Sequence, residues 1–124
     1  MSLYQKLQQR AEENKPILVG MIGIGKFGSM YLAQVPNTPG VEVAGVADLF
    51  PSQAKSNLLQ VGWDGERLSV DSLDDAISLG RTYVTDDWEA LVEHPEFDVI
   101  VESTGSPTDA VDHILAAFAH GKHV

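Results

Sequence analysis

The chain has 124 residues, no cysteine, and a net charge of −10 from 18 acidic and 8 basic residues. This length suits one domain, and the missing thiols exclude disulfides and cysteine-bound zinc. The acidic balance disfavours nucleic acid and anionic membrane surfaces as partners. No apolar run approaches the roughly 18 residues that span a bilayer, and the polar N-terminus lacks a signal core, so we expect a cytoplasmic protein.

The first fifteen residues predict a helix that stands before the main domain. Ser2 and Gln5 have the spacing of a capping box, and an apolar stripe follows at helical intervals. We favour a helix that covers one edge of the sheet, and keep a dimer contact or a domain-packing arm as the alternative. The expected organisation is therefore an N-terminal helix over residues 1–15 and one domain over residues 16–124.

A buried-strand pattern from Ile17 to Ile22 leads directly into the motif Gly23-x-Gly25-x-x-Gly28, and a helical pattern follows. Gly23 lets the chain turn sharply off the strand. Gly25 lets a pyrophosphate approach the backbone, and Gly28 lets the helix lie close to the strand. The free N–H groups and the positive dipole end of that helix then face the anion. This arrangement predicts a dinucleotide-binding turn.

The second strand, Val41 to Ala47, ends at Asp48, which stands 20 residues past the last glycine of the motif, at position 28. This is where dinucleotide-binding folds place the acid that binds the adenosine ribose hydroxyls. A carboxylate there repels a 2′-phosphate, and no arginine follows in residues 49–55, so NAD is the preferred cofactor. Ser52 and Lys55 leave NADP open.

The rest of the chain continues the alternation of helices and strands. The pattern first predicts a helix from Pro51 to about Gln60, a loop at Gly62–Gly65, and a short helix that is capped by Asp71 or Ser72 and ends at Leu79. A strand at Thr82–Thr85, a helix capped by Asp86 or Asp87, and a strand at Asp98–Glu102 follow. The last elements are a helix over Thr108–His120, with Val111, Ile114, Leu115 and Phe118 inward, and the first step of a strand at Lys122–Val124.

Alternating elements of this kind predict an α/β fold of the Rossmann type. Its doubly wound parallel sheet would have the strand order 3-2-1-4, with a fifth strand begun at the end of the sequence. Such a sheet is normally completed by further strands and followed by a substrate-binding domain. We therefore expect this sequence to be the N-terminal part of a longer enzyme.

Ser103, Thr104 and Gly105 follow the fourth strand, beside the point where the strand order reverses and where open α/β sheets bind ligands. Capping of the last helix is the alternative role for the two hydroxyls. Glu102 is either catalytic or orders this loop. Cofactor contacts are therefore expected at ten positions: Gly23, Ile24, Gly25, Lys26, Phe27, Gly28, Asp48, Ser103, Thr104 and Gly105.

Within that set, Lys26 either lies over the pyrophosphate as a cation or is a solvated residue of the first helical turn. Phe27 is expected to offer its backbone N–H to a phosphate oxygen. We expect no metal site from His113, His120 and His123, because the helix ends before the last of them. All three histidines are placed toward the far end of the last helix, and no catalytic residue is expected among these 124 residues.

Three segments carry a family resemblance: Gly20–Met30, Val46–Asp48 and His94–Gly105. Together they resemble the NAD(P)-binding domain of homoserine dehydrogenase-like oxidoreductases. The resemblance is closest to a bacterial subgroup of predicted homoserine dehydrogenases, some of which act as NADPH-dependent reductoisomerases on 1-deoxy-D-xylulose 5-phosphate. It implies NAD or NADP as the cofactor, catalytic residues and a small-molecule substrate on a later domain, and no turnover by these residues alone.

Three functions follow from the sequence and the resemblance. The first is the dinucleotide-binding domain of an NAD(P)-dependent, homoserine dehydrogenase-like oxidoreductase. The second is the corresponding domain of a reductoisomerase-like enzyme. The third is a non-catalytic NAD(P)-sensing module, since Rossmann domains also serve as switches. A homo-oligomer is compatible with each of them.

Overall fold

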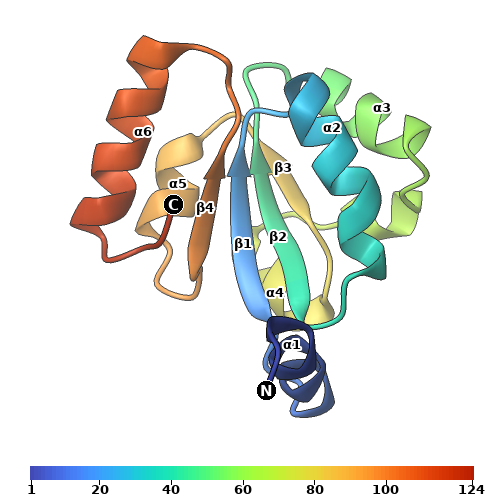
Figure 1. The fold of residues 1–124 in the computed structure, drawn as a ribbon. Helices are drawn as coiled ribbons and strands as arrows, with labels where there is room; N and C mark the ends of the chain where they lie inside the picture. The colour runs from blue at the N-terminus through green and yellow to red at the C-terminus, as the bar shows by residue number, and fades with distance from the viewer.

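The computed structural model describes the backbone of residues 1–124 and every side chain except those of Lys26 and Phe27. Figure 1 shows a central sheet with helices on both faces. The elements are α1 (Leu3–Glu12), β1 (Ile17–Ile22), α2 (Gly25–Gln34), the 3₁₀ turn η1 (Val35–Asn37), β2 (Val41–Ala47), α3 (Pro51–Gln60), the 3₁₀ turn η2 (Gly65–Leu68), α4 (Leu73–Leu79), β3 (Tyr83–Thr85), α5 (Trp88–Glu93), β4 (Val99–Glu102) and α6 (Pro107–Ala119).

The four strands are parallel and lie in the order β3-β2-β1-β4, which confirms the predicted Rossmann-type sheet. Next to β4, His123 pairs in parallel with Val99, so the predicted first step of a fifth strand is present. Because the strands are parallel, their carboxyl ends meet at one edge of the sheet, the upper edge in Figure 1. The loops that follow β1, β2 and β4 converge there, at the reversal of strand order.

Each face of the sheet has its own apolar core. The helices α2 and α3 cover one face, and α4, α5 and α6 cover the other (Figure 1). The first core is built around Met21, Leu32, Val46 and Leu58, and the second around Ile22, Leu91, Ile100 and Ala117, all at most 3% exposed. Two-sided burial explains why these strands read as continuous apolar runs.

Local capping bonds fix where several helices begin and end. Ser2 and Gln5 form both bonds of the predicted capping box at α1. Ser72, one of two residues predicted to cap α4, accepts the N–H of Asp75, and Gly80 ends that helix in the left-handed conformation. Asp87 caps α5 by accepting the N–H of Ala90. Within the helices that the structure describes, none has the length and apolar character needed to cross a bilayer.

The prediction that the first helix covers a sheet edge is wrong. In Figure 1, α1 lies beyond the amino ends of β1 and β2, whereas the edge strands are β3 and β4. None of its residues is buried, because its apolar stripe is too narrow to form a core face. It rests on Gly40, where an added Cβ would stand 2.1 Å from the carbonyl oxygen of Leu7.

Two polar side chains anchor loops to the cores. Trp63, predicted only as a loop residue, is 6% exposed and donates its Nε1 hydrogen to the Leu32 carbonyl at 2.7 Å. The ammonium of Lys122 donates to the carbonyls of His94 and Phe97 at 2.6 and 3.0 Å. Burial lowers the pKa of Lys122. These bonds tie Lys122, which follows α6, to the loop after α5.

The predicted inward face of the last helix is wrong at three of its four residues, and the fourth, Ile114, is half-buried. Val111, Leu115 and Phe118 are 54%, 61% and 60% exposed, while His113 and Ala117 are buried. The helix is rotated so that small alanines meet the sheet closely and the imidazole of His113 reaches a carboxylate at the end of β4. The pairing of His113 and the close packing of the alanines thus decide which face of α6 meets the sheet, although the large apolar side chains lie on another face.

Candidate functional site

A cleft of about 390 Å³ opens where the carboxyl ends of the strands meet. Its walls come from the loops after β1, β2, β3 and β4 and from one face of α6. The lining residues are Ile22, Gly23, Ile24, Gly25, Ala47, Asp48, Leu49, Phe50, Asp86, Trp88, Ser103, Thr104, Ser106, Asp109 and His113. Ligand crevices of open α/β sheets lie at this position.

The first glycine of the motif joins two loops of the cleft. Gly23 has φ of +81°, and an added Cβ would stand 2.8 Å from Cα of Thr104. Its N–H donates to Ala47 at 2.7 Å, and its carbonyl accepts the hydroxyl of Ser103 at 2.7 Å. The turn after β1 is therefore held between the ends of β2 and β4.

The second and third glycines have different surroundings. Gly25 has φ of +46°, begins α2 and is exposed on the cleft wall. An added Cβ there would have Ser103 O, at 3.4 Å, as its only neighbour within 4 Å among the atoms that the structure describes. Gly28 is buried, and its Cβ would stand 2.8 Å from the terminal methyl of Met21 on β1. Gly25 therefore keeps a backbone surface open to the cleft, and Gly28 brings α2 close to the sheet.

The N-terminus of α2 presents hydrogen-bond donors to the same space. The N-cap residue of this helix is Ile24, whose side chain makes no capping bond. Uncapped N–H groups and the helix dipole make such an end attractive to an anion. The side chains of Lys26 and Phe27, predicted near the phosphates, lie outside the described residues.

Asp48 connects the glycine loop to the loop after β2. One carboxylate oxygen accepts the N–H of Ile24 at 3.2 Å, and the other accepts the N–H of Phe50 at 3.0 Å. A carboxylate offers about four acceptor positions, so this side chain keeps capacity for hydroxyl donors. Leu49 and Phe50 beside it are 82% and 69% exposed.

The residues after β4 divide into two groups. Ser103 and Thr104 line the cleft, and Ser103 is fixed by bonds to Ile22 and Gly23. Gly105, with φ of +74°, is exposed and lies outside the lining set. Among the residues described, the structure thus brings Gly23, Ile24, Gly25, Asp48, Ser103 and Thr104 together around one cleft, while Gly28 lies behind its wall.

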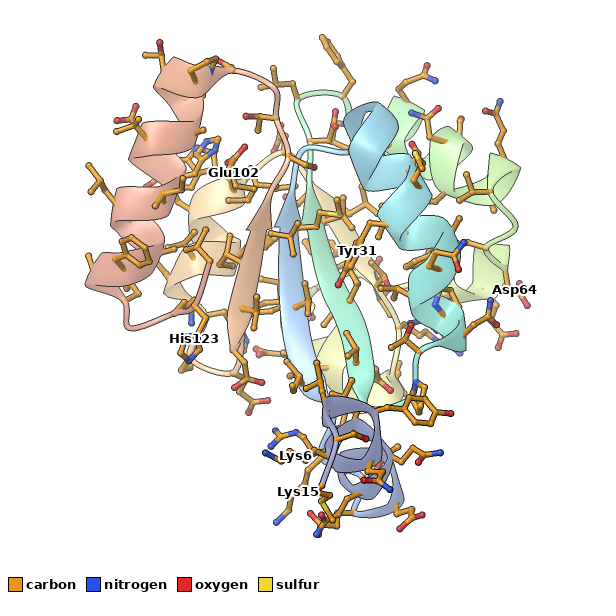
Figure 2. All side chains as sticks on the ribbon, viewed as in Figure 1. Lys6, Lys15, Tyr31, Asp64, Glu102 and His123 are labelled. Atoms are coloured by element: carbon orange, nitrogen blue, oxygen red, sulfur yellow. The ribbon has the colours of Figure 1, made fainter. Side chains whose placement is uncertain are left out.

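Glu102 ends β4 beside the cleft, and Figure 2 shows its side chain directed toward α6. One carboxylate oxygen accepts the backbone N–H of Thr104 at 2.7 Å and its hydroxyl at 2.6 Å. The other oxygen pairs with Nδ1 of His113. The side chains of Glu102 and His113 are only 8% and 9% exposed, and the imidazole lies against Trp88 with ring centroids 4.4 Å apart.

Residues 23–124 match the family described as homoserine dehydrogenase, NAD binding domain. The chain belongs to this family. Homoserine dehydrogenase from Methylobacillus glycogenes is 33% identical over 112 residues, a stretch that covers 89% of this chain and 24% of that protein. The chain therefore spans about a quarter of that relative's length and is an NAD-binding domain of the homoserine dehydrogenase-like oxidoreductase type, as the sequence predicts.

Solved structures with the same fold include a dehydrogenase and an oxidoreductase. Myo-inositol dehydrogenase from Lactobacillus casei, in complex with NAD(H) and myo-inositol, has a TM-score of 0.63 at 19% identity and covers 86% of this chain and 26% of its own. An NAD-binding oxidoreductase from Klebsiella pneumoniae has a TM-score of 0.55 at 22% identity, covering 88% and 26%. At these identities the likeness concerns the fold.

In this NAD-binding domain, the residue that sequence reasoning missed is His113. The prediction placed the histidines toward the far end of the last helix, yet His113 lies along the cleft, seven residues after the helix N-cap at Ser106. A signal was available in the spacing of Ala110, His113 and Ala117, which share one helical face. Trp88, Asp86 and Asp109 also line the cleft and were not predicted there.

Proposed function

We propose that this chain holds the dinucleotide of an NAD(P)-dependent oxidoreductase along the cleft, with nine of the ten predicted residues as its contacts, while Gly28 packs α2 against the sheet behind the wall. The observation that carries the proposal is that one cleft joins the glycine turn, the uncapped start of α2, Asp48 and the loop after β4. When bound, the nicotinamide ring supplies or accepts a hydride. The residues of this chain bind and orient it.

Each part of the cleft suits a different part of a dinucleotide. The space in front of Gly25, which an added Cβ would enter, and the donors at the start of α2 suit the pyrophosphate. The remaining acceptor capacity of Asp48 suits the two hydroxyls of the adenosine ribose. The hydroxyls and N–H groups of Ser103, Thr104 and Gly105 suit the nicotinamide half.

Asp48 is expected to set the preference for NAD over NADP. In Asp48→Ser, a two-oxygen acceptor and a negative charge are lost, so NADH affinity should fall about tenfold and the ratio of NADPH to NADH affinity should rise. Fluorescence titration of both nucleotides measures this.

The matched control is Asp64→Ser. Asp64 accepts the N–H of Glu66, two residues on, at 3.0 Å, just as Asp48 accepts that of Phe50. Asp64 lies beside α3, away from the cleft (Figure 2), so its variant should leave both affinities unchanged. A wild type that prefers NADPH, together with an unshifted ratio in Asp48→Ser, would contradict the assignment of Asp48 to the ribose.

We further propose that the chain is the N-terminal part of a longer cytoplasmic enzyme, with an N-terminal helix over residues 1–15, a dinucleotide domain over residues 16–124 and the substrate on a later domain. The support is that the matched stretch covers only 24% of the homoserine dehydrogenase from Methylobacillus glycogenes. A homoserine dehydrogenase-like enzyme and a reductoisomerase-like enzyme would both contain this dinucleotide-binding domain. A homo-oligomer is compatible with both.

These 124 residues alone are expected to bind NADH and to turn over no substrate, because we place the substrate site, and with it the proton donor that carbonyl reduction needs, on a later domain. Absorbance at 340 nm should stay constant with NADH or NADPH and either aspartate semialdehyde or 1-deoxy-D-xylulose 5-phosphate, and with NAD and homoserine. Turnover would reveal a catalytic group within this chain. An NAD-sensing module would remain inactive in the longer polypeptide as well, which separates the sensor from the enzyme.

A further inference from the structure

We infer that Glu102 and His113 form a positioning pair that sets the loop of residues 103–105 for the nicotinamide half of the dinucleotide. The inference rests on the proposed function and adds a residue pair to it. It starts from the burial of the pair, since a carboxylate that is 8% exposed is costly in a protein unless it is well paired.

Both oxygens of the Glu102 carboxylate face partners inside the protein. It accepts the N–H and the hydroxyl of Thr104 on one oxygen and faces Nδ1 of His113 with the other. A carboxylate with these three donors is poorly placed to accept a further proton from a substrate. Its role is therefore to hold groups in position rather than to act on a substrate itself.

Glu102 holds Thr104, the part of the loop after β4 that faces the glycine turn. The backbone of Thr104 stands 2.8 Å from the place where a Cβ on Gly23 would lie. The hydroxyl of Thr104 also accepts the N–H of Ser106, the N-cap residue of α6, at 3.4 Å. A change at Glu102 would thus reach both the glycine turn and the start of α6 through Thr104.

His113 gives this arrangement its rigidity. Its ring is fixed on one side by Glu102 and lies against Trp88, the first residue of α5, on another. Trp88 and His113 both line the cleft. Because buried polar groups that satisfy one another specify a unique geometry, the pair ties the loop after β4 to two helices at once.

The pair is distinct in role from Asp48. Asp48 connects the glycine loop to the loop after β2, at the adenosine end, whereas Glu102 organises the loop after β4. Loss of the pair should therefore weaken ligands that extend beyond adenosine monophosphate and should spare AMP itself. This selectivity separates positioning from a general loss of structure.

The first test uses the unmodified chain and needs no variant. In amide and imidazole NMR spectra, signals of Thr104 and His113 should shift on saturation with NADH and stay in place on saturation with AMP. If both residues keep their shifts when NADH is bound, the inference is overturned. If NADH does not bind at all, the proposed function fails first, and the two failures are thus distinguished.

The second test uses Glu102→Gln and His113→Phe. The amide keeps the shape of Glu102 but loses its charge and one acceptor, and phenylalanine keeps a ring against Trp88 without Nδ1. In each variant NADH affinity should fall about tenfold or more, as expected for loss of a hydrogen bond to a charged group. The affinity for AMP should remain within about twofold of the wild-type value, which is small beside the tenfold loss expected for NADH.

The control is a second histidine–carboxylate pair on the same face of the sheet. Asp74 pairs with Nε2 of His94 at 2.8 Å but is 87% exposed and lies outside the cleft lining. Asp74→Asn should change neither affinity. Equal weakening of NADH and AMP in Glu102→Gln, or unchanged NADH affinity in a folded variant, overturns the inference. If a variant does not fold, the spectra of the unmodified chain decide.

Discussion

The Gly25→Ala variant is expected to bind NADH about 100-fold more weakly than the wild type, or about 2.7 kcal/mol less favourably. The added methyl group would stand in the open space beside the start of α2, with Ser103 O at 3.4 Å as its nearest described neighbour. That space is where the pyrophosphate must approach the backbone. Alanine is preferable to valine, because φ of +46° is especially unfavourable for a β-branched residue.

The backbone strain of Gly25→Ala has a matched control in Gly80→Ala. Gly80 also has a left-handed conformation, with φ of +66°, and an added Cβ there meets nothing within 4 Å among the described atoms. Both variants should lose about 1–2 kcal/mol of unfolding free energy, measured by urea denaturation. Only Gly25→Ala should lose NADH affinity, measured by fluorescence titration. Unchanged affinity in a folded Gly25→Ala would remove the glycine turn from the cofactor site.

Gly23→Ala is expected to lower the free energy of unfolding strongly. Its φ of +81° is unfavourable for alanine, and its Cβ would stand 2.8 Å from Cα and 2.9 Å from N of Thr104. These neighbours are backbone atoms of a loop held by Glu102, so they cannot move aside as a flexible side chain would. Strain and overpacking together should lower the unfolding free energy by roughly 2–5 kcal/mol.

Urea denaturation of Gly23→Ala and Gly80→Ala under the same conditions measures the difference. Gly80→Ala should show the cost of the left-handed conformation alone, about 1–2 kcal/mol. If the two variants are equally stable, the loop after β4 yields to the new methyl group. The rigid contact between the two loops of the cleft would then be contradicted.

Much of this fold follows from local patterns in the sequence. The strands are apolar on both faces and are bounded by turn residues, so their extent and their parallel order were predictable. The caps at Ser2, Ser72 and Asp87 are decided by bonds within three residues. The roles of Gly23 and Gly28 in turning and packing follow from their places between a strand and a helix.

The features that escaped prediction depend on contacts between distant residues. The inward face of α6 carries the small Ala117 and His113, which pairs with Glu102 eleven positions away, in place of the larger apolar side chains. Trp63 enters the core because its indole reaches the carbonyl of Leu32, 31 residues away. The position of α1 depends on its contact with Gly40. None of these partners can be identified from periodicity alone.

The central claim is that the dinucleotide occupies the cleft at the carboxyl ends of the strands, and amide chemical-shift mapping during an NADH titration tests it most directly. The expected result is a saturable set of shifts confined to residues 22–28, 48–50, 86–88 and 103–106. Shifts gathered instead around the second hollow of about 200 Å³, lined by residues such as Pro36, Thr38 and Glu42 at the opposite end of the sheet, would contradict it. So would a spectrum that NADH leaves unchanged.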